Sequence, residues 1–415
     1  MDKMQAVEDI VIVGAGIAGL STALGLYRMG LRSLILESAD RLRVSGFSFL
    51  AWMNAWKALD TLGVGDKLRK QHILLDKTFA YTTVNGVSPI AQLSFRTPGK
   101  HGTHEARCVR RKLVVEALAD ELPRGSIRYN SGLVSIEQKG HAKLLHLADG
   151  SVIKTKILIG CDGVNSVVAK WLDIPEPVLT GRVATRGLAE YPDRHDFKAE
   201  FLQYFGDGFR CGFLPVDEKS IYWFFTCSPS LDVEKGIRSS ASKAKQFVMS
   251  KLANLPEEVR GIIERTETDI VFSSPLRLRL PWDVVGRSIC KGNVCVAGDA
   301  LHPMTPDLAQ GGCSALEDGI TLARFLGEAL LKKPKGGAEE GEEEEHKRIE
   351  KGLEKYAKER KWRLFNLTTT SYLLGAIQQS SGMVLNFVRD RCFPRMLLQL
   401  YLKWSDFDCG KLYIP

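Results

Sequence analysis

One acidic residue, Asp299, stands in a stretch whose composition suits ligand binding, VCVAGDALHPMTPDLAQGG over 294–312. Its apolar start predicts a buried strand over 294–297, and Gly298-Asp299 predicts a tight turn directly after that strand. Gly311-Gly312 opens a predicted apolar helix, whose free N–H groups can bind a negatively charged or electron-accepting group. We therefore expect this stretch to form one end of a ligand site, with Asp299 binding a polyhydroxyl chain.

A second candidate site lies near the N-terminus, where residues 9–26 read DIVIVGAGIAGLSTALGL. A β-branched strand leads into a Gly-x-Gly-x-x-Gly pattern and an apolar helix, and a second strand ends at Glu37. Gly14 suits the tight turn, Gly16 lets backbone approach a pyrophosphate, and Gly19 lets the helix pack on the strand. Glu37 follows at about the distance expected for a carboxylate that binds ribose hydroxyls. The combination predicts a dinucleotide site.

Two other segments could complete these sites. A predicted buried strand over 157–160 runs into Asp162 and Gly163, which again places an acid and a glycine after a strand. A helix is predicted over 108–122, CVRRKLVVEALADEL. Arg110 near its start could contact a cofactor phosphate, and a solvated basic turn is the alternative.

The middle of the chain, 176–275, lacks β-α alternation and predicts a mainly antiparallel sheet. Its segments GRVATRGLAEY, FLQYFGDGFRCGFLPV and SIYWFFTCS are β-branched and aromatic. A sheet beside a nucleotide domain can form the side wall of a pocket. Because side chains alternate between the faces of a strand, about half of the aromatic residues should face away. The candidates for substrate contact are Phe201, Tyr204, Phe213, Trp223 and Phe225.

The chain has 415 residues, too many for one ordinary domain, and its 44% hydrophobic content is ordinary for a globular enzyme. We expect an α/β fold with a Rossmann-like nucleotide domain, a mainly antiparallel substrate sheet and a C-terminal helical layer. The nucleotide domain is predicted over 1–74, 101–175 and 276–331, the substrate domain over 75–100 and 176–275, a charged linker over 332–346, and the C-terminal helices over 347–415.

Several classes of protein are disfavoured by composition. The net charge is +8, but no basic run with interleaved aromatic residues indicates nucleic-acid binding. The nine cysteines contain no C-x-x-C, which is typical of a reducing compartment and predicts neither disulfides nor a metal site. No secretory signal and no apolar stretch of membrane-spanning length is seen, so we expect a cytoplasmic protein.

The C-terminal segment over 364–404 is rich in apolar residues and carries Arg389, Arg391 and Arg395 near its middle. It could contact a membrane surface as a peripheral, amphipathic segment. A helical layer that covers the two domains is the favoured reading, because the segment also contains polar stretches.

Taken together, the motifs of the two sites resemble those of the class A FAD-dependent monooxygenases of the para-hydroxybenzoate hydroxylase fold. The resemblance covers almost the whole chain and is closest to the plant branch described as salicylate-hydroxylase-like or zeaxanthin-epoxidase-like. It is carried by RxxGFxxxxWxNAWKALDxLGVGDxLR, CVRRKL, CDGVNSVVAKWL, VCVAGDALHPMTPDLAQGGCSALEDG and DFDCGKL.

The resemblance implies roles for individual residues. Asp299 would bind the ribityl chain of FAD, and Pro306 would lie near the reactive flavin carbon. Arg43 would belong to a loop beside the flavin ring, so Arg43 and Pro306 would position the flavin, and no acid–base residue is implied. Ala309 departs from the glycine that is frequent in relatives. The implied cofactor-binding residues are Gly14, Gly16, Gly19, Glu37, Arg43, Arg110, Asp162, Gly163, Gly298, Asp299, Pro306, Gln310, Gly311 and Gly312.

The implied reaction is oxygenation. NADPH or NADH, bound transiently, would reduce FAD, and O2 would add to give a flavin C4a-hydroperoxide. This species would hydroxylate or epoxidise a small aromatic or unsaturated apolar metabolite, and the protein would be a monomer or homodimer. The alternatives are an FAD-dependent reductase or desaturase of the same fold acting on an isoprenoid-like substrate, and a non-catalytic protein of this fold that binds lipidated partners.

Overall fold

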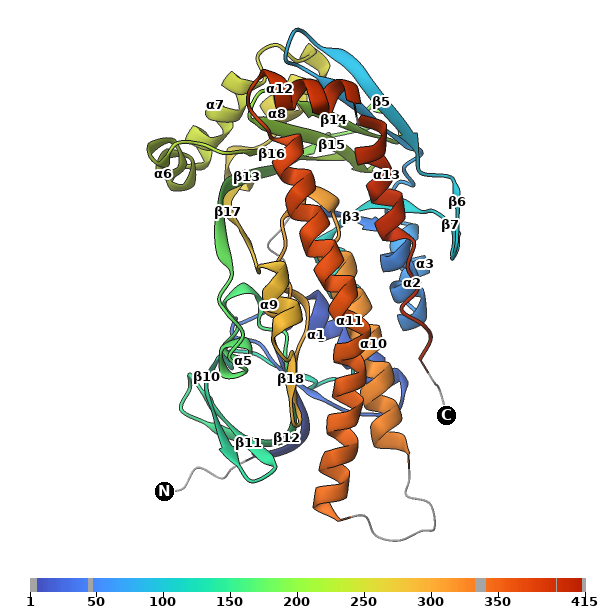
Figure 1. The fold of residues 1–415 in the computed structure, drawn as a ribbon, viewed down its shortest axis with the longest axis vertical. Helices are drawn as coiled ribbons and strands as arrows, with labels where there is room; N and C mark the ends of the chain where they lie inside the picture. Colours follow the sequence, from blue (N-terminus) through green and yellow to red (C-terminus); the bar gives the residue numbers. More distant parts are fainter. Residues whose placement is uncertain (1–5, 44–47, 333–340, 393, 413–415) are drawn as a thin grey trace.

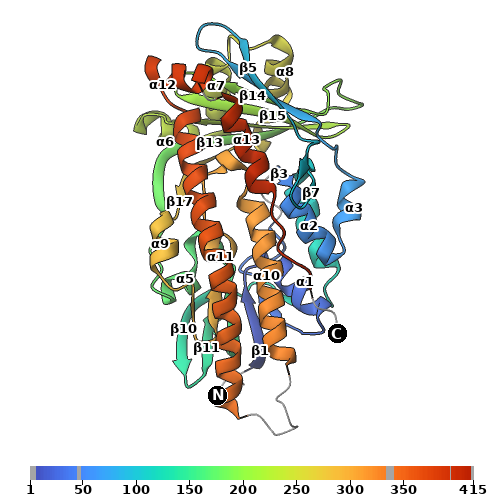
Figure 2. The same cartoon turned by 45° about the vertical axis from the view of Figure 1, so that its right-hand side comes forward.

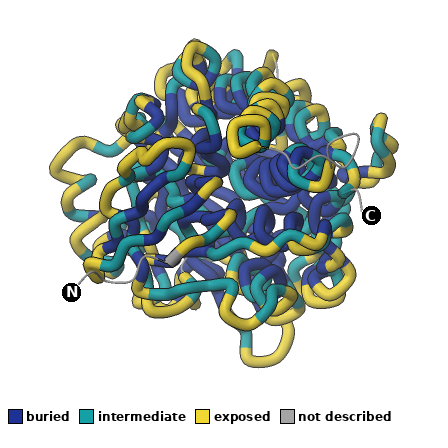
Figure 3. Tube along the Cα trace, turned by 90° about the horizontal axis from the view of Figure 1, so that it is seen from below, coloured by how far each residue is buried: buried dark blue, intermediate teal, exposed yellow. Residues whose placement is uncertain are grey.

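A computed structural model describes residues 6–43, 48–332, 341–392 and 394–412 of the chain. Two large β-sheets lie at opposite ends of the molecule, and long helices run between them (Figure 1). In a turned view, these helices still run along the length of the molecule (Figure 2). Seen from below, buried positions gather in the middle and exposed positions form the rim (Figure 3).

The eight-stranded sheet has a parallel centre. β1 (Ala6–Val13) pairs with β2 (Leu34–Leu36) and with β12 (Val152–Gly160), and β12 also pairs with β19 (Val294–Val296). Parallel strands are covered on both faces, which explains their nearly continuous runs of Val, Ile and Leu. The remaining strands are β9 (Ile127–Arg128), β10 (Leu133–Lys139), β11 (Ala142–Leu147) and β18 (Cys290–Lys291).

The seven-stranded sheet is antiparallel except where β14 pairs with β4. Its strands are rich in β-branched and aromatic residues, which pack well on a pleated surface. One face covers a separate apolar core shared with helices α7 (Ala241–Lys251) and α8 (Glu257–Arg265). Its strands, in spatial order, are β17 (Phe272–Leu278), β13 (Val178–Glu190), β16 (Ser220–Cys227), β15 (Phe209–Asp217), β14 (Glu200–Phe205), β4 (Lys77–Thr82) and β5 (Ser88–Ser94).

Small residues let the central helices approach closely. α1 (Ile17–Arg28) packs on α10 (Gly311–Leu331), and a Cβ added at Gly25 would lie 2.7 Å from the Cβ of Ala323. Next to them, α11 (Glu342–Gln378) is 37 residues long and reaches from the first sheet to the second (Figure 1). This helix therefore connects the two ends of the molecule.

The other elements are short. The helices are α2 (Met53–Leu62), α3 (Gly65–Arg69), α4 (Arg111–Asp120), α5 (Val167–Trp171), α6 (Leu231–Ser239), α7 (Ala241–Lys251), α8 (Glu257–Arg265), α9 (Pro281–Gly286), α12 (Met383–Phe387) and α13 (Pro394–Ser405). Two small ladders pair β3 (Ser48–Trp52) with β8 (Ala106–Arg110) and β6 (Pro98–Gly99) with β7 (Gly102–Thr103). Single turns are η1 (Gly163–Asn165), η2 (Thr268–Ile270), η3 (Gly298–Ala300), η4 (Pro306–Leu308) and the π turn η5 (Val388–Cys392).

The expected architecture is confirmed: an α/β fold with a Rossmann-like sheet, a mainly antiparallel second sheet and C-terminal helices. The strands at 77–94 belong to the same sheet as those at 178–278, although the chain visits the first sheet in between. The residue boundaries of the domains stay predictions.

Two element boundaries differ from the expectation. The helix expected over 108–122 begins only at Arg111, because the preceding residues form β8 and pair with β3. The charged linker expected over 332–346 is shorter, since α11 begins at Glu342. Four glutamates occupy the first turn of α11, where the helix dipole favours negative charge. Residues 333–340 of that linker lie outside the described residues.

Candidate active site

Two cavities lie along the carboxyl ends of β1, β12 and β19, the edge where open α/β sheets bind ligands. The larger has a volume of about 410 Å³ and the smaller of about 280 Å³. They share the lining residues Gly16, Arg111, Cys161 and Gly163. An elongated ligand can therefore extend from one cavity into the other.

The glycines of the fingerprint act in two different ways. A Cβ on Gly14 would lie 2.4 Å from the carbonyl oxygen of Cys161, and a Cβ on Gly19 would lie 2.0 Å from the carbonyl oxygen of Gly14. A Cβ on Gly16 would meet no described atom within 4 Å. Gly14 and Gly19 thus allow the chain to pack closely on itself. Gly16, which lines both cavities, leaves backbone open to a ligand.

Glu37 lies at the far end of the smaller cavity, directly after β2. Its carboxylate accepts hydrogen bonds from the N–H groups of Ala15 (3.0 Å) and Ala39 (2.9 Å). These bonds hold the carboxylate at the end of β2. Arg43 lies 3.4 Å from the same carboxylate and lines only the smaller cavity. Arg43 is thus placed at the Glu37 end of the site, and its expected role in a loop beside the flavin ring stays a prediction.

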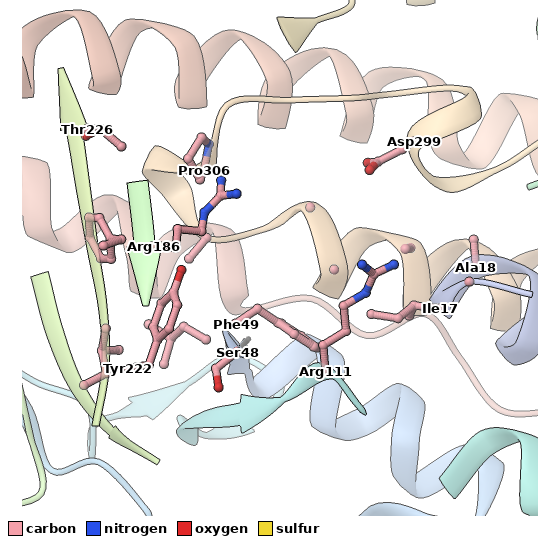
Figure 4. Close-up of a pocket in the computed structure, with 18 of the residues that line it drawn as sticks. Ile17, Ala18, Ser48, Phe49, Arg111, Arg186, Tyr222, Thr226, Asp299 and Pro306 are labelled. Carbon is pink, nitrogen blue, oxygen red and sulfur yellow. The ribbon is translucent and has the colours of Figure 1, made fainter. Parts of the chain in front are cut away.

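The turn after β19 presents Asp299 to the larger cavity. Asp299 is exposed although its neighbours in η3 are buried, and it is the one carboxylate among the described lining residues. Arg111 lies opposite and lines both cavities (Figure 4). Burial lowers the pKa of the Arg111 guanidinium, and the charge of Asp299 opposes this shift. Asp299 and Arg111 thus place a negative and a positive charge near the residues that the two cavities share.

Arg110 is not part of the cavity lining. Its guanidinium donates to Asp217 (3.2 Å) and Glu190 (3.3 Å), on strands of the second sheet. Arg110, expected to contact the cofactor, thus points away from both cavities, and the reason is local. Arg110 ends β8 and Arg111 begins α4, so the two side chains leave the backbone in different directions. Arg111, one residue later, lines both cavities.

Three of the expected cofactor-binding residues form hydrogen bonds with other residues of the protein. The carboxylate of Asp162 accepts from the N–H of Val167, the first residue of α5, at 2.7 Å, and Asp162 lines the smaller cavity. The N–H of Gly298 donates to the buried Asp318 at 2.7 Å. The side-chain oxygen of Gln310 accepts from Asn54 at 2.8 Å, and Gln310 is fully buried. Gly298 and Gln310 therefore shape the turn and do not line either cavity.

The second sheet forms the wall of the larger cavity opposite Asp299. Arg186 on β13 points toward Pro306, and Tyr222 on β16 lies beside it (Figure 4). Burial raises the pKa of Tyr222 to about 12, and Arg186 opposes the shift, so the hydroxyl is a neutral donor at pH 7. Arg210 on β15 also lines the cavity and is 3% exposed, with Nε lacking a hydrogen-bond partner among the described residues.

Only one of the five expected substrate aromatics lines this cavity, namely Phe201. Tyr204 and Phe213 line a different cavity of about 300 Å³, and Trp223 and Phe225 are buried in the apolar core behind the sheet. The reason is strand alternation, which turns neighbouring residues to opposite faces. The aromatic residues of β16 that do line the site are Tyr222 and Phe224.

A buried ion pair holds the loop that carries Pro306. Asp307 is fully buried, and Arg182 on β13 donates to both of its oxygens at 2.9 and 2.6 Å. Gln379, just after α11, donates to Asp307 at 3.1 Å. Ala309 follows in the left-handed region with φ of 51°, a conformation that favours glycine. The loop is thus attached to the second sheet and to α11.

A second buried network lies under the turn at Asp299. Asp318 on α10 accepts from Arg360 on α11 at 2.7 Å, and Arg360 also donates to Glu317 at 2.6 Å. All three side chains are fully buried. Burial by itself would raise the pKa of both carboxyls, but neighbouring cationic groups outweigh it and hold both pKa values below their ordinary range. Two adjacent acids inside an apolar helix were the sequence signal for this network.

A family model described as FAD binding domain matches residues 8–355. The chain belongs to this family and is an FAD-dependent monooxygenase of class A, which confirms the resemblance seen in the motifs. Among curated proteins, it is 50% identical over 405 residues to Monooxygenase 2 of Arabidopsis thaliana, covering 97% of this chain and 98% of the relative. It is 36% identical over 414 residues to Monooxygenase 1 of the same plant, covering 97% and 99%.

Among solved structures, Klebsiella pneumoniae HpxO complexed with FAD and uric acid has a TM-score of 0.78 at 22% identity, with 99% of both chains covered. The residues present here fit FAD: Gly16 leaves backbone open, Glu37 and Asp299 offer carboxylates at opposite ends, and the two cavities join. The non-catalytic alternative is not supported, because the relatives are monooxygenases and hydroxylases. No described helix is long and apolar enough to span a membrane.

Proposed function

We propose that this enzyme takes electrons from NADPH or NADH and hydroxylates a flat aromatic small molecule that carries a negative charge. The observation that carries the proposal is the lining of the larger cavity. Three guanidinium groups, from Arg111, Arg186 and Arg210, face it together with the single carboxylate of Asp299. Arg210 is also paired with the buried Asp307 at 3.5 Å. A cavity with this excess of positive charge favours an anionic ligand.

The two sides of the larger cavity have different tasks. On the turn side, Asp299 would hydrogen-bond the ribityl chain of FAD, and Gly311 and Gly312 would approach the flavin ring. On the sheet side, Phe224 and Phe201 offer flat apolar surface to an aromatic ring.

Arg186 and the neutral hydroxyl of Tyr222 supply hydrogen-bond donors beside those rings. We propose that they bind the charged group of the substrate and so fix which ring carbon faces Pro306.

FAD bound here would supply the oxygen chemistry: with two electrons from NADPH or NADH, one atom of O2 would be inserted into the substrate and the other would leave as water. The protein then has to orient the substrate and exclude water. Phe49, Leu50 and Leu214 make the cavity wall apolar, which excludes water from the reacting groups. Among the described lining residues there is no acid–base pair, and the proposed reaction assigns no proton transfer to one.

The test is substrate-dependent oxidation of NADPH and NADH by the FAD-loaded enzyme, with and without O2. Aromatic carboxylates and phenolates are compared with neutral analogues of the same shape, and oxygen uptake is followed. We expect only anionic ligands to stimulate uptake and to yield a hydroxylated product. Equal product yield under strict anaerobiosis would instead indicate the reductase or desaturase reaction.

A variant separates binding of the anion from oxygen chemistry. Arg186→Met should raise KM for the anionic substrate about tenfold or more, since a charge-assisted hydrogen bond is lost, and should change kcat less. Arg287→Met, on the exposed loop after α9, is the matched control. An unchanged KM in Arg186→Met would contradict the proposed subsite.

A cytoplasmic location and a monomeric or homodimeric state remain part of the proposal.

A further inference from the structure

Large apolar side chains are exposed near the C-terminus to a degree unusual for a protein surface. Met383 is 88% exposed, Val384 74%, Leu385 54% and Phe387 60%, all on α12. Met396 on the following α13 is 51% exposed. We call these five side chains the C-terminal apolar patch. α12 lies at the end of the molecule that holds the second sheet (Figure 1).

α12 buries its polar residue and exposes its apolar residues, which is the reverse of an ordinary surface helix. Its polar residue, Asn386, is 5% exposed and donates to Asp207 at 3.0 Å. The N–H of Gly382 donates to the same carboxylate at 3.0 Å. Arg389 donates to the carbonyl of Gly206 at 2.9 Å. These bonds attach the helix to the turn between β14 and β15 with its apolar side chains directed outward, so the patch cannot be buried without breaking them.

The charges beside the patch are positive. Arg391 and Arg395 are exposed between α12 and Met396, and within the described chain neither forms an ion pair. Asp390 is the one acid of the segment from 372 to 403, and it is paired with the neighbouring Arg389 at 2.5 Å. A partner that covers the patch therefore meets uncompensated positive charge at its edge, which favours an anionic surface.

The spread of the apolar side chains indicates what kind of partner covers them. Successive residues of an α-helix are about 100° apart, so Met383, Val384 and Leu385 together span about 200° of the helix circumference. A groove on another protein accepts one stripe of a helix. Side chains that project over more than half of the circumference fit a fluid apolar medium better, and at five residues α12 is too short to cross a bilayer.

We propose that the C-terminal apolar patch docks the enzyme onto an anionic lipid bilayer. Met383, Val384, Leu385 and Phe387 insert among the acyl chains at the interface, while Arg391 and Arg395 contact anionic headgroups. The anchoring turn joins β14 to β15, the strands that carry Phe201 and Arg210 of the larger cavity. Docking thus sets the end of the molecule that holds the second sheet against the membrane, and this inference does not depend on which substrate is used.

The test is co-sedimentation of the purified, FAD-loaded enzyme with vesicles of phosphatidylcholine, with and without phosphatidylserine. We expect binding to the anionic vesicles that weakens as salt rises. Val384→Glu combined with Phe387→Glu should lower the vesicle partition coefficient about tenfold or more. The reason is that two apolar side chains that insert into the bilayer are replaced by charges. Arg391→Glu combined with Arg395→Glu should remove the preference for phosphatidylserine and leave weak binding.

Trp282→Glu is the matched control, since Trp282 on α9 is 63% exposed and lies outside the patch. It should bind vesicles as the unmodified enzyme does. All variants should keep their FAD and their melting temperature, because the changed side chains face solvent.

Sedimentation velocity without vesicles tests a second copy of this chain as the occupant. A dimer that Val384→Glu with Phe387→Glu converts to monomer, together with no vesicle binding, would overturn the proposal. So would vesicle binding that survives this double substitution unchanged.

Discussion

Asp299 combines an exposed carboxylate with a buried, well-ordered turn, and this combination suits a residue that binds a cofactor hydroxyl. The N–H of Gly298 is held by Asp318 from below, so the turn is formed before any ligand binds. Preorganisation of this kind lowers the entropic cost of binding. The proposed role of Asp299 on the ribityl chain is thereby open to a direct measurement.

Asp299→Ala should weaken FAD binding about tenfold or more, because each buried hydrogen bond to the ribityl chain contributes on the order of 1 kcal/mol. Titration of the apoprotein with FAD, followed by flavin fluorescence, measures the effect. Asp269→Ala, at an exposed position in η2, should bind FAD normally. Full FAD affinity in Asp299→Ala would remove Asp299 from the site.

Ala309 offers a residue-scale test of backbone strain. Its φ of 51° costs an alanine about 1 kcal/mol relative to glycine. Ala309→Gly should therefore raise the free energy of unfolding by up to about that amount, measured by denaturant unfolding at saturating FAD. Ala300→Gly, at a buried alanine without positive φ, should instead lower it. Equal losses in both variants would show that the loop gains nothing from glycine.

At the scale of elements, Asp307 determines how the loop that carries Pro306 is held. The loop contributes Pro306 and Ala309 to the larger cavity, yet its strongest bonds go to Arg182 on β13 and Gln379 beyond α11. The cofactor side and the substrate side of the cavity are thus joined through one carboxylate. A movement of β13 would be transmitted to Pro306.

Asp307→Asn should lower the free energy of unfolding by about 3 kcal/mol, because it leaves the guanidinium of Arg182 buried without its charge partner. Denaturant unfolding measures the loss. Asp120→Asn removes an exposed ion pair with Lys67 and should cost less than about 1 kcal/mol. If both variants lose the same small amount, the buried pair does not hold the loop.

At the scale of the whole molecule, α11 joins the two sheets. Near its middle, Arg360 bonds to Asp318 and Glu317 of α10, and its end reaches the loop at Asp307. The two networks are therefore supported by a single helix. Stability of the whole molecule should depend on the charged state of the buried carboxyls.

The pKa values of Glu317 and Asp318 are lowered in the folded state. The stability they provide is fully present above their unfolded pKa values, about 4, and is lost as pH falls below that range. Thermal melting between pH 7 and pH 3 should show this loss.

Arg360→Met removes the group that favours both charges, so its stability should be lower throughout and its acid-induced loss should begin at higher pH. Lys358→Met, exposed on the same helix, should follow the unmodified enzyme. An unchanged acid profile in Arg360→Met would contradict the assigned role of the network.

Local patterns of the sequence were enough to predict the fold class, the flavin cofactor and the turns that carry the glycines, Glu37 and Asp299. These features depend on neighbours along the chain: a strand, a turn and a helix follow one another within a few residues. For the same reason, the resemblance of the motifs to class A monooxygenases was confirmed.

Only the tertiary structure decided which side chains face the larger cavity and which hold the loops. Whether Arg110 or Arg111 lines the site depends on where a strand ends and a helix begins, a boundary that periodicity does not resolve. Whether Trp223 or Phe224 faces the cavity depends on which face of the sheet is covered by α7 and α8. The pairing of Asp307 with Arg182, 125 positions earlier in the chain, arises only when the second sheet closes over the first. Contacts between distant segments follow from packing. The sequence of one strand therefore does not predict which distant residues its side chains contact.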